Sequence, residues 1–144
     1  LINSVLVLKC GDETYSTIDI SIIDLFSGDV EFVKTGAPPT YVKKADDVEI
    51  VKAASLPAGI LGNIETELMH KTVEDGDIII MTTDGIVDSF ASENNGEKEL
   101  AGFIRGITSA NPQEFADIIL KEAETRCGGQ PEDDMTVVVA KIWC

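Results

Sequence analysis

The sequence predicts an α+β fold in which antiparallel strands come first, helices follow, and a single strand closes the chain. Short runs rich in β-branched residues recur through residues 15–73, and glycine, proline and aspartate turns separate them. Residues 86–126 instead carry apolar side chains at helical spacing, and residues 135–143 return to a strand pattern. This order favours a layered α+β domain over alternating βαβ units.

The first half of the chain reads as hairpins. Residues 1–8 resemble the end of a helix that begins outside the chain, so we expect the chain to be a fragment. Residues 15–25 and 30–35 are expected to pair around the turn Ser27-Gly28-Asp29. Gly36-Ala37-Pro38-Pro39 then breaks the ladder, because neither proline can donate a hydrogen bond.

Three further strands are expected before the helices. Short strands at 41–44 and 48–52 flank an acidic turn, and a glycine- and proline-rich loop occupies 56–62. Residues 65–73 alternate as a strand does and lead through a tight turn into 78–83. The latter run is almost wholly apolar, which predicts a central strand that is buried on both faces.

The helical part begins with residues 86–90. Residues 92–99 are polar and are expected to form a loop, and 100–108 a short helix. Residues 112–126 give the strongest helical signal, with Asn111 as N-cap and Pro112 at the first helical position. One face of this helix is expected to carry Phe115, Ile118, Ile119 and Glu122.

Composition restricts the classes of function. The 144 residues fit one domain with a buried core. Eleven basic residues face 26 acidic ones, a formal net charge of −15, which should repel nucleic acid and anionic lipid. No apolar stretch approaches the length of a membrane span, so we expect no membrane contact by this chain.

The cysteines indicate the cellular setting. Cys10, Cys127 and Cys144 lie far apart, no CxxC occurs, and His70 is the only histidine, so a zinc site is not expected. An odd cysteine count without a signal peptide indicates a reducing, cytoplasmic location.

Carboxylates stand at the ends of two apolar runs. Asp84 follows the run 78–83, and Asp133 and Asp134 precede the run 135–143. If these runs are neighbouring strands, their carboxylates meet at one edge of a sheet and repel each other unless a cation lies between them. Hard oxygen ligands suit Mg²⁺ or Mn²⁺, so a metal-dependent hydrolytic site is the leading hypothesis. Strand alternation would let only one of the two adjacent aspartates point at the site.

These features together resemble a known family. A run ending in Thr83-Asp84-Gly85, followed by Asp133-Asp134-Met135-Thr136 and a terminal strand, is similar to the later half of the PP2C-type metal-dependent protein phosphatases. The ordered set over nearly the whole chain resembles the phosphatase domain of the stage II sporulation protein E family. That set includes Asn3-Ser4-Val5-Leu6, Lys34-Thr35-Gly36-Ala37-Pro38-Pro39 and Ser55-Leu56-Pro57-Ala58-Gly59-Ile60.

The resemblance implies a PP2C-like β-sandwich flanked by helices (α/β/β/α) and a serine/threonine phosphatase with a binuclear Mn²⁺ or Mg²⁺ centre. In that chemistry a metal-bound water attacks the phosphorus. Asp84 and Asp133 match two metal-ligand positions of the family, Asp134 takes the place of an asparagine, and Gly85 would serve packing and turn geometry.

One departure matters for activity. The family's earlier Asp-Gly motif, which bridges both metals, is not in this chain. We therefore expect residues 1–144 to be the C-terminal part of a single PP2C-like domain, inactive or nearly so alone. Several strands of the sandwich would be missing, and the exposed strand edges favour pairing with another chain, including a homodimer.

The resemblance also implies partners. The expected substrate is a phosphoserine protein, an anti-sigma factor antagonist, whose dephosphorylation activates a sporulation sigma factor; stress-response regulators use the same phosphatase class. The parent protein is expected to be membrane-anchored, with this domain on the cytoplasmic side.

Two other interpretations share part of this pattern. A haloacid-dehalogenase-type phosphatase would need a nucleophilic aspartate two residues before Asp84, where Thr82 stands. A non-catalytic PP2C-like module that acts only by contact remains open, and such a module should tolerate Asp84→Asn and Asp133→Asn.

Overall fold

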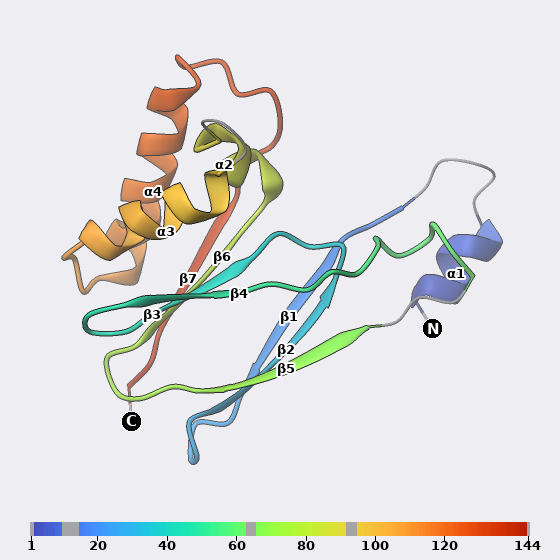
Figure 1. Ribbon diagram of the computed structural model, residues 1–144, viewed down its shortest axis with the longest axis horizontal. Coiled ribbons are helices and arrows are strands. Elements are labelled where there is room, and N and C mark those ends of the chain that lie inside the picture. The colour runs from blue at the N-terminus through green and yellow to red at the C-terminus, as the bar shows by residue number, and fades with distance from the viewer. Residues whose placement is uncertain (1, 10–14, 63–65, 92–94, 144) are drawn as a thin grey trace. The chain divides into compact units, whose positions relative to one another are not determined.

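The computed structural model describes residues 2–9, 15–62, 66–91 and 95–143 (Figure 1). The chain forms two compact units that each draw on separate stretches of sequence. The first contains Leu1–Ala37 and Lys52–Thr72, and the second contains Pro38–Val51 and Val73–Cys144.

The first unit holds a three-stranded antiparallel sheet of order β1-β2-β5. β1 (Ile18–Ile23) pairs with β2 (Asp29–Thr35), as the hairpin prediction required, although β1 is shorter than the expected strand. β2 pairs on its other edge with β5 (Glu67–Thr72). At the turn, Gly28 has φ of 75°, a backbone conformation that glycine adopts without a steric cost.

A buried ion pair joins the first two strands. Val30 and Phe32 of β2 are fully buried, and Lys34 follows them on the same face of the strand. The Lys34 ammonium lies 2.5 Å from an oxygen of Asp19, whose side chain is 15% exposed. Burying both charges carries a desolvation penalty, but separating them would leave one buried charge unpaired, which is more unfavourable. The pair therefore favours the register of the hairpin that brings Lys34 to Asp19.

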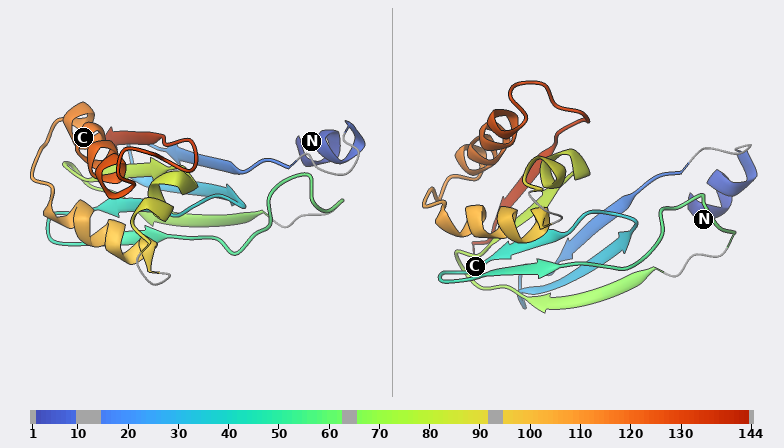
Figure 2. Two further views of the ribbon diagram at one scale, coloured as in Figure 1. Left: turned by 90° about the horizontal axis from the view of Figure 1, so that it is seen from above. Right: turned by 45° about the horizontal axis from the view of Figure 1, so that its top comes forward.

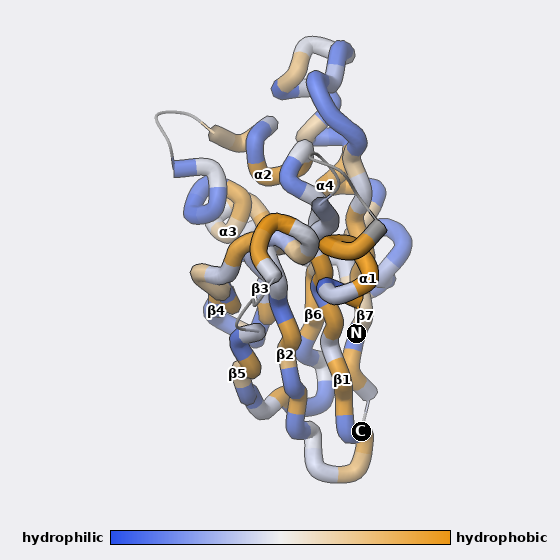
Figure 3. Tube along the Cα trace, turned by 90° about the vertical axis from the view of Figure 1, so that its right-hand side faces the viewer, coloured by the Kyte–Doolittle hydropathy of each residue, from blue (hydrophilic) through white to orange (hydrophobic). Residues whose placement is uncertain are grey.

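Helix α1 (Ile2–Lys9) occupies the region where the sequence predicted the end of a helix. Its residues are mostly hydrophobic, as Figure 3 shows, and Leu8 is 85% exposed. Asn3 fastens the helix to the loop that follows Pro57. Its Oδ1 accepts a hydrogen bond from Gly59 N at 2.8 Å, and its Nδ2 donates to Leu61 O at 3.1 Å.

The second unit holds a four-stranded antiparallel sheet of order β4-β3-β6-β7. β3 (Thr40–Lys43) and β4 (Val48–Val51) form the predicted hairpin. β6 (Ile78–Thr82) lies between β3 and β7 (Val137–Lys141), and four of its five residues are buried, which confirms the central strand.

Three helices of the second unit lie together beside its sheet (Figures 1 and 2). These are α2 (Asp84–Ser89), α3 (Gly96–Gly106) and α4 (Pro112–Arg126). Apolar side chains from all three helices meet sheet residues in one core, whose largest fully buried members are Tyr41, Ile80, Ile86, Phe90, Leu100, Ile104, Phe115 and Ile119.

The longest helix, α4, has the limits and the cap that the sequence predicted, but not the whole of its predicted buried face. α4 has the predicted limits, and the side chain of Asn111 accepts hydrogen bonds from Gln113 N at 2.9 Å and Glu114 N at 3.2 Å. Its expected buried face was partly wrong, because Ile118 is 39% exposed while Ala123 is buried. Within the described ranges, no helix is both long and apolar enough to cross a bilayer.

Candidate functional site

The pairing of β6 with β7 brings the two acidic segments to the same end of the sheet. Thr82, the last residue of β6, pairs with Val137, the first residue of β7. Asp84 therefore lies just beyond the end of β6, at the same end of the sheet as residues 133–136, which lead into β7. The sequence predicted this arrangement on the condition that the two runs were neighbours, and they are.

Thr83 joins the two segments, a role that the sequence did not predict. Its backbone N donates to Thr136 O at 3.1 Å. Its hydroxyl accepts from Thr136 N at 2.9 Å and donates to Asp134 O at 3.0 Å. The signal available in the sequence was a hydroxyl residue directly before Asp84, at the N-cap of α2.

Gly85 lies against the backbone of the second acidic segment. A Cβ at this position would come within 2.8 Å of Asp134 O and 3.3 Å of Asp133 O. The predicted packing role of Gly85 agrees with this geometry. Its place is the second residue of α2, however, so it belongs to the helix and not to a turn.

Asp84 opens α2 and its side chain is exposed. One of its carboxylate oxygens lies 3.1 Å from Gly85 N, as expected for an acidic residue in a first helical turn. The exposure of Asp84 leaves its carboxylate open to solvent at this end of the sheet.

Asp133 and Asp134 are exposed and lie in a loop, because β7 begins only at Val137. The expected alternation of their side chains along a strand was therefore wrong. Asp133 Oδ1 accepts a hydrogen bond from Asp134 N at 2.7 Å, so it is the predicted ligand Asp133 that also contacts the local backbone.

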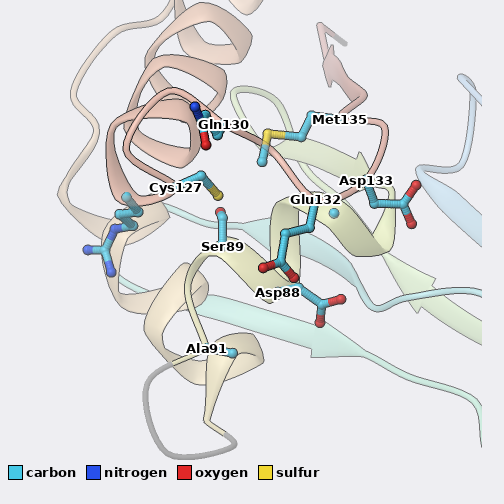
Figure 4. A pocket seen from close by; sticks show the side chains of 10 residues that line it. Asp88, Ser89, Ala91, Cys127, Gln130, Glu132, Asp133 and Met135 are labelled. Atoms are coloured by element: carbon cyan, nitrogen blue, oxygen red, sulfur yellow. The ribbon is translucent and has the colours of Figure 1, made fainter.

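A pocket of about 330 Å³ adjoins this loop. Gly85 and Asp133 line it together with residues of α2 and of the end of α4 (Figure 4). Figure 4 shows the Asp133 carboxylate pointing away from the side chains of Asp88 and Glu132. The guanidinium of Arg126 also lines the pocket, and it lies 4.3 Å from the ring centroid of Phe90.

The donor set fits a hard cation only in part. Asp84 and Asp133 supply carboxylate oxygens, the ligand type that Mg²⁺ and Mn²⁺ prefer. Among the described residues, no group of three or more histidine, cysteine, aspartate or glutamate side chains is placed to hold a metal ion. The described residues therefore offer part of a metal site.

Other residues that the sequence brought forward have structural surroundings. Asp24 caps the β1–β2 turn, with Phe26 N donating to it at 2.8 Å, and Asp19 belongs to the buried ion pair, so the two do not share a site. His70 is exposed on β5, with its Nδ1 3.7 Å from Glu31.

The comparisons with known proteins agree with this geometry. The family model of stage II sporulation protein E (SpoIIE) matches residues 1–143. The chain belongs to the SpoIIE family. Stage II sporulation protein E of Bacillus subtilis (strain 168) is 40% identical over 141 residues, which are 98% of this chain and 17% of that protein.

Solved SpoIIE structures have the same fold. The PP2C phosphatase domain of B. subtilis SpoIIE with a fragment of its regulatory domain matches with a TM-score of 0.88 and 39% identity over 97% of this chain and 42% of that one. The phosphatase domain of B. subtilis SpoIIE presoaked with Mn matches with a TM-score of 0.82 and 37% identity, covering 99% of this chain and 63% of that one. The predicted α+β, PP2C-like fold class is confirmed. The chain spans about a sixth of the full-length relative and less than two thirds of its phosphatase domain.

Proposed function

We propose that residues 1–144 are the C-terminal part of a single PP2C-like domain whose activity is metal-dependent dephosphorylation of serine or threonine in a protein. The observation that carries this proposal is the β6–β7 pairing, which brings Asp84 and Asp133 to one sheet end in a chain of the SpoIIE family.

The residues at that sheet end have distinct roles in the proposal. Asp84 and Asp133 would hold one Mn²⁺ or Mg²⁺ ion, and further ligands, including those of a second ion, would come from parts of the domain outside this chain. When bound, such an ion lowers the pKa of water and stabilises negative charge on a phosphoryl group. Thr83 and Gly85 keep the two aspartates in position, through the hydroxyl bridge and the close backbone approach respectively.

The finer assignment concerns the substrate and the setting. The family supports a role in sporulation, and we infer a phosphoserine substrate on an anti-sigma factor antagonist, with sigma-factor activation as the outcome. The parent protein would be membrane-associated and present this domain to the cytoplasm.

The test uses the full-length protein that contains this chain and a phosphoserine protein as substrate, with Mn²⁺ added. Asp84→Asn and Asp133→Asn should each lower kcat/KM by at least about a hundredfold, because each removes a direct ligand, whereas outer-sphere changes cost up to about that much. Asp117→Asn is the matched control, since it removes the same charge from an exposed position on α4 and should change the rate less than about twofold.

The isolated chain gives a second test. At millimolar Mn²⁺ it should hydrolyse an aryl phosphate at or near the uncatalysed rate, because its ligand set is incomplete. Clear turnover that Asp84→Asn abolishes would contradict the incomplete site and would indicate that another copy of the chain supplies the missing ligands.

A non-catalytic module is the second candidate, favoured by the lack of a three-ligand cluster among the described residues. In that case a full-length protein with Asp84→Asn and Asp133→Asn would keep its cellular function. Loss of that function with retained partner binding would exclude the module.

A further inference from the structure

The second unit has a groove at the end of its sheet away from Asp84. Its volume is about 440 Å³, within the range of ligand-binding pockets. Its basic residues come from three elements: Lys43 and Lys44 at the end of β3, Arg105 in the last turn of α3, and Lys141 at the end of β7.

Cations gather at this groove although the whole chain carries −15. Its lining holds four cationic side chains against the carboxylates of Asp75 and Asp77, and two further acids outside the lining pair with two of these cations. An anionic ligand is therefore repelled by most of the surface and attracted here, which focuses it on the groove.

Two of the lysines lack an acidic partner among the described residues. The Lys43 ammonium donates to the carbonyl oxygen of Arg105 at 3.0 Å, and the Lys141 ammonium lies 5.5 Å from the ring centroid of Trp143. Both side chains are half-buried. Burial lowers the pKa of Lys43, and the nearby Arg105 cation lowers it further. An anion between these groups would offset that repulsion.

The other two cations are already partly neutralised and shape the walls. Arg105 lies 2.8 Å from Asp47, and Lys44 lies 3.6 Å from Glu49 and 4.0 Å from Asp77. Their contacts hold the β3–β4 turn beside the end of α3. The two lysines without carboxylate contacts are thus the groups that remain for a ligand.

We propose that this groove binds a short acidic segment of a partner protein. A peptide can place separate carboxylates on Lys43 and Lys141, which lie on the two strands that flank Ile78 of β6, roughly 10 Å apart at the backbone. A free phosphate is a single compact anion and matches two separated cations less well. A nucleic acid or an anionic membrane would extend its charge beyond the groove onto a repelling surface.

The proposal goes beyond the phosphatase assignment and does not rest on it. Ile78 begins β6 and Asp84 follows the other end of that strand; the five residues of β6 alone span roughly 15 Å at about 3.3 Å each. A segment bound in the groove would therefore not touch the groups at the Asp84 end, and its binding can be measured without any turnover.

The test measures the fluorescence anisotropy of a labelled peptide, acetyl-Glu-Asp-Leu-Glu-Asp-amide, on addition of the 144-residue chain at low salt. We expect saturable binding that the isosteric peptide with Gln and Asn in place of Glu and Asp does not show. The double change Lys43→Gln with Lys141→Gln should weaken binding by at least about tenfold. The chain's single tryptophan, Trp143, lies beside Lys141 and should change its emission as the peptide binds.

The matched control is Lys98→Gln with Lys121→Gln, which alters net charge equally at exposed positions of α3 and α4 outside the groove. It should change affinity less than about twofold at moderate salt. The pair Lys43→Arg with Lys141→Arg should retain binding and guards against a loss caused by misfolding.

Three results would overturn the proposal. These are equal weakening by the groove and control pairs, no binding of the acidic peptide at millimolar concentration, and binding of inorganic phosphate or phosphatidylglycerol vesicles in its place.

Discussion

Gly85 packs against a backbone oxygen, which cannot move aside as a flexible side chain can. Gly85→Ala would place a methyl group 2.8 Å from Asp134 O, so we expect a loss of about 1–3 kcal/mol in the free energy of unfolding. This loss should exceed the gain from the higher helix propensity of alanine, about 1 kcal/mol. Urea unfolding of the purified chain measures the difference.

Gly102→Ala is the control for that substitution. Gly102 is also inside a helix, but a Cβ there would meet open space. It should therefore stabilise the chain by up to about 1 kcal/mol. If both variants shifted the unfolding midpoint in the same direction, the close approach at Gly85 would not be the cause.

Asp24 makes a residue-scale contribution that depends on pH. Backbone N–H groups of Phe26 and then Ser27 lower the pKa of its carboxyl group below the usual 3.8. Because the folded-state pKa is the lower one, the stabilisation is present above pH 3.8 and is lost as the pH falls through the folded-state value. The difference in unfolding free energy between the wild type and Asp24→Asn should therefore shrink below pH 3.8. A difference that is constant from pH 6 to pH 3 would refute it.

At the scale of elements, α4 depends on its N-cap. Asn111→Ala removes the acceptor for Gln113 N and Glu114 N and should cost about 0.5–2 kcal/mol. Asn95→Ala is the control, because Asn95 occupies the N-cap position of α3 without a side-chain cap bond and should cost less. Thermal unfolding monitored by circular dichroism compares the two.

The first residues of the helices were predicted least well from the sequence. α2 begins at Asp84, two residues before the predicted Ile86. Thr83 and Asp84 suit the end of a strand, but they equally suit the N-cap and first turn of a helix. α3 begins at Gly96, so part of the expected loop at 92–99 is helical; residues 92–94 lie outside the described ranges. The first turn of α3 is polar in sequence and therefore looked like a loop. The apolar residues that α3 buries, Leu100, Ala101 and Ile104, all lie after that turn.

Strand pairs that are close in sequence could be predicted, whereas a pair that is distant in sequence could not. Both hairpins were predictable from turn residues that lie between their strands. The pairing of β2 with β5 joins segments more than thirty residues apart and leaves no local signal. At the candidate site, the aspartates could be recognised in the sequence as possible ligands. The role of Thr83 could not, because its hydroxyl bonds the backbone of Asp134 and Thr136, about fifty residues away.

For the whole molecule, net charge sets a further expectation. The formal net charge is −15 because carboxylates outnumber basic groups. Their mutual repulsion is stronger in the compact folded chain than in the expanded unfolded chain. Raising NaCl from 0.01 to 0.15 M shortens the Debye length from about 30 to about 8 Å, so Tm should rise. Tetramethylammonium chloride should act alike, and a rise seen only with Na⁺ would point instead to a specific ion site.

The two units are interleaved along the chain, which passes from one to the other after Ala37, Val51 and Thr72. A ribosome that makes this chain therefore releases every residue of the first unit before β6 has emerged. The β3–β4 hairpin is by then complete, yet one edge of β3 must wait for a partner that is still being synthesised. During that interval β3 presents unpaired backbone groups, and a nascent chain stalled there would be the form most exposed to mispairing.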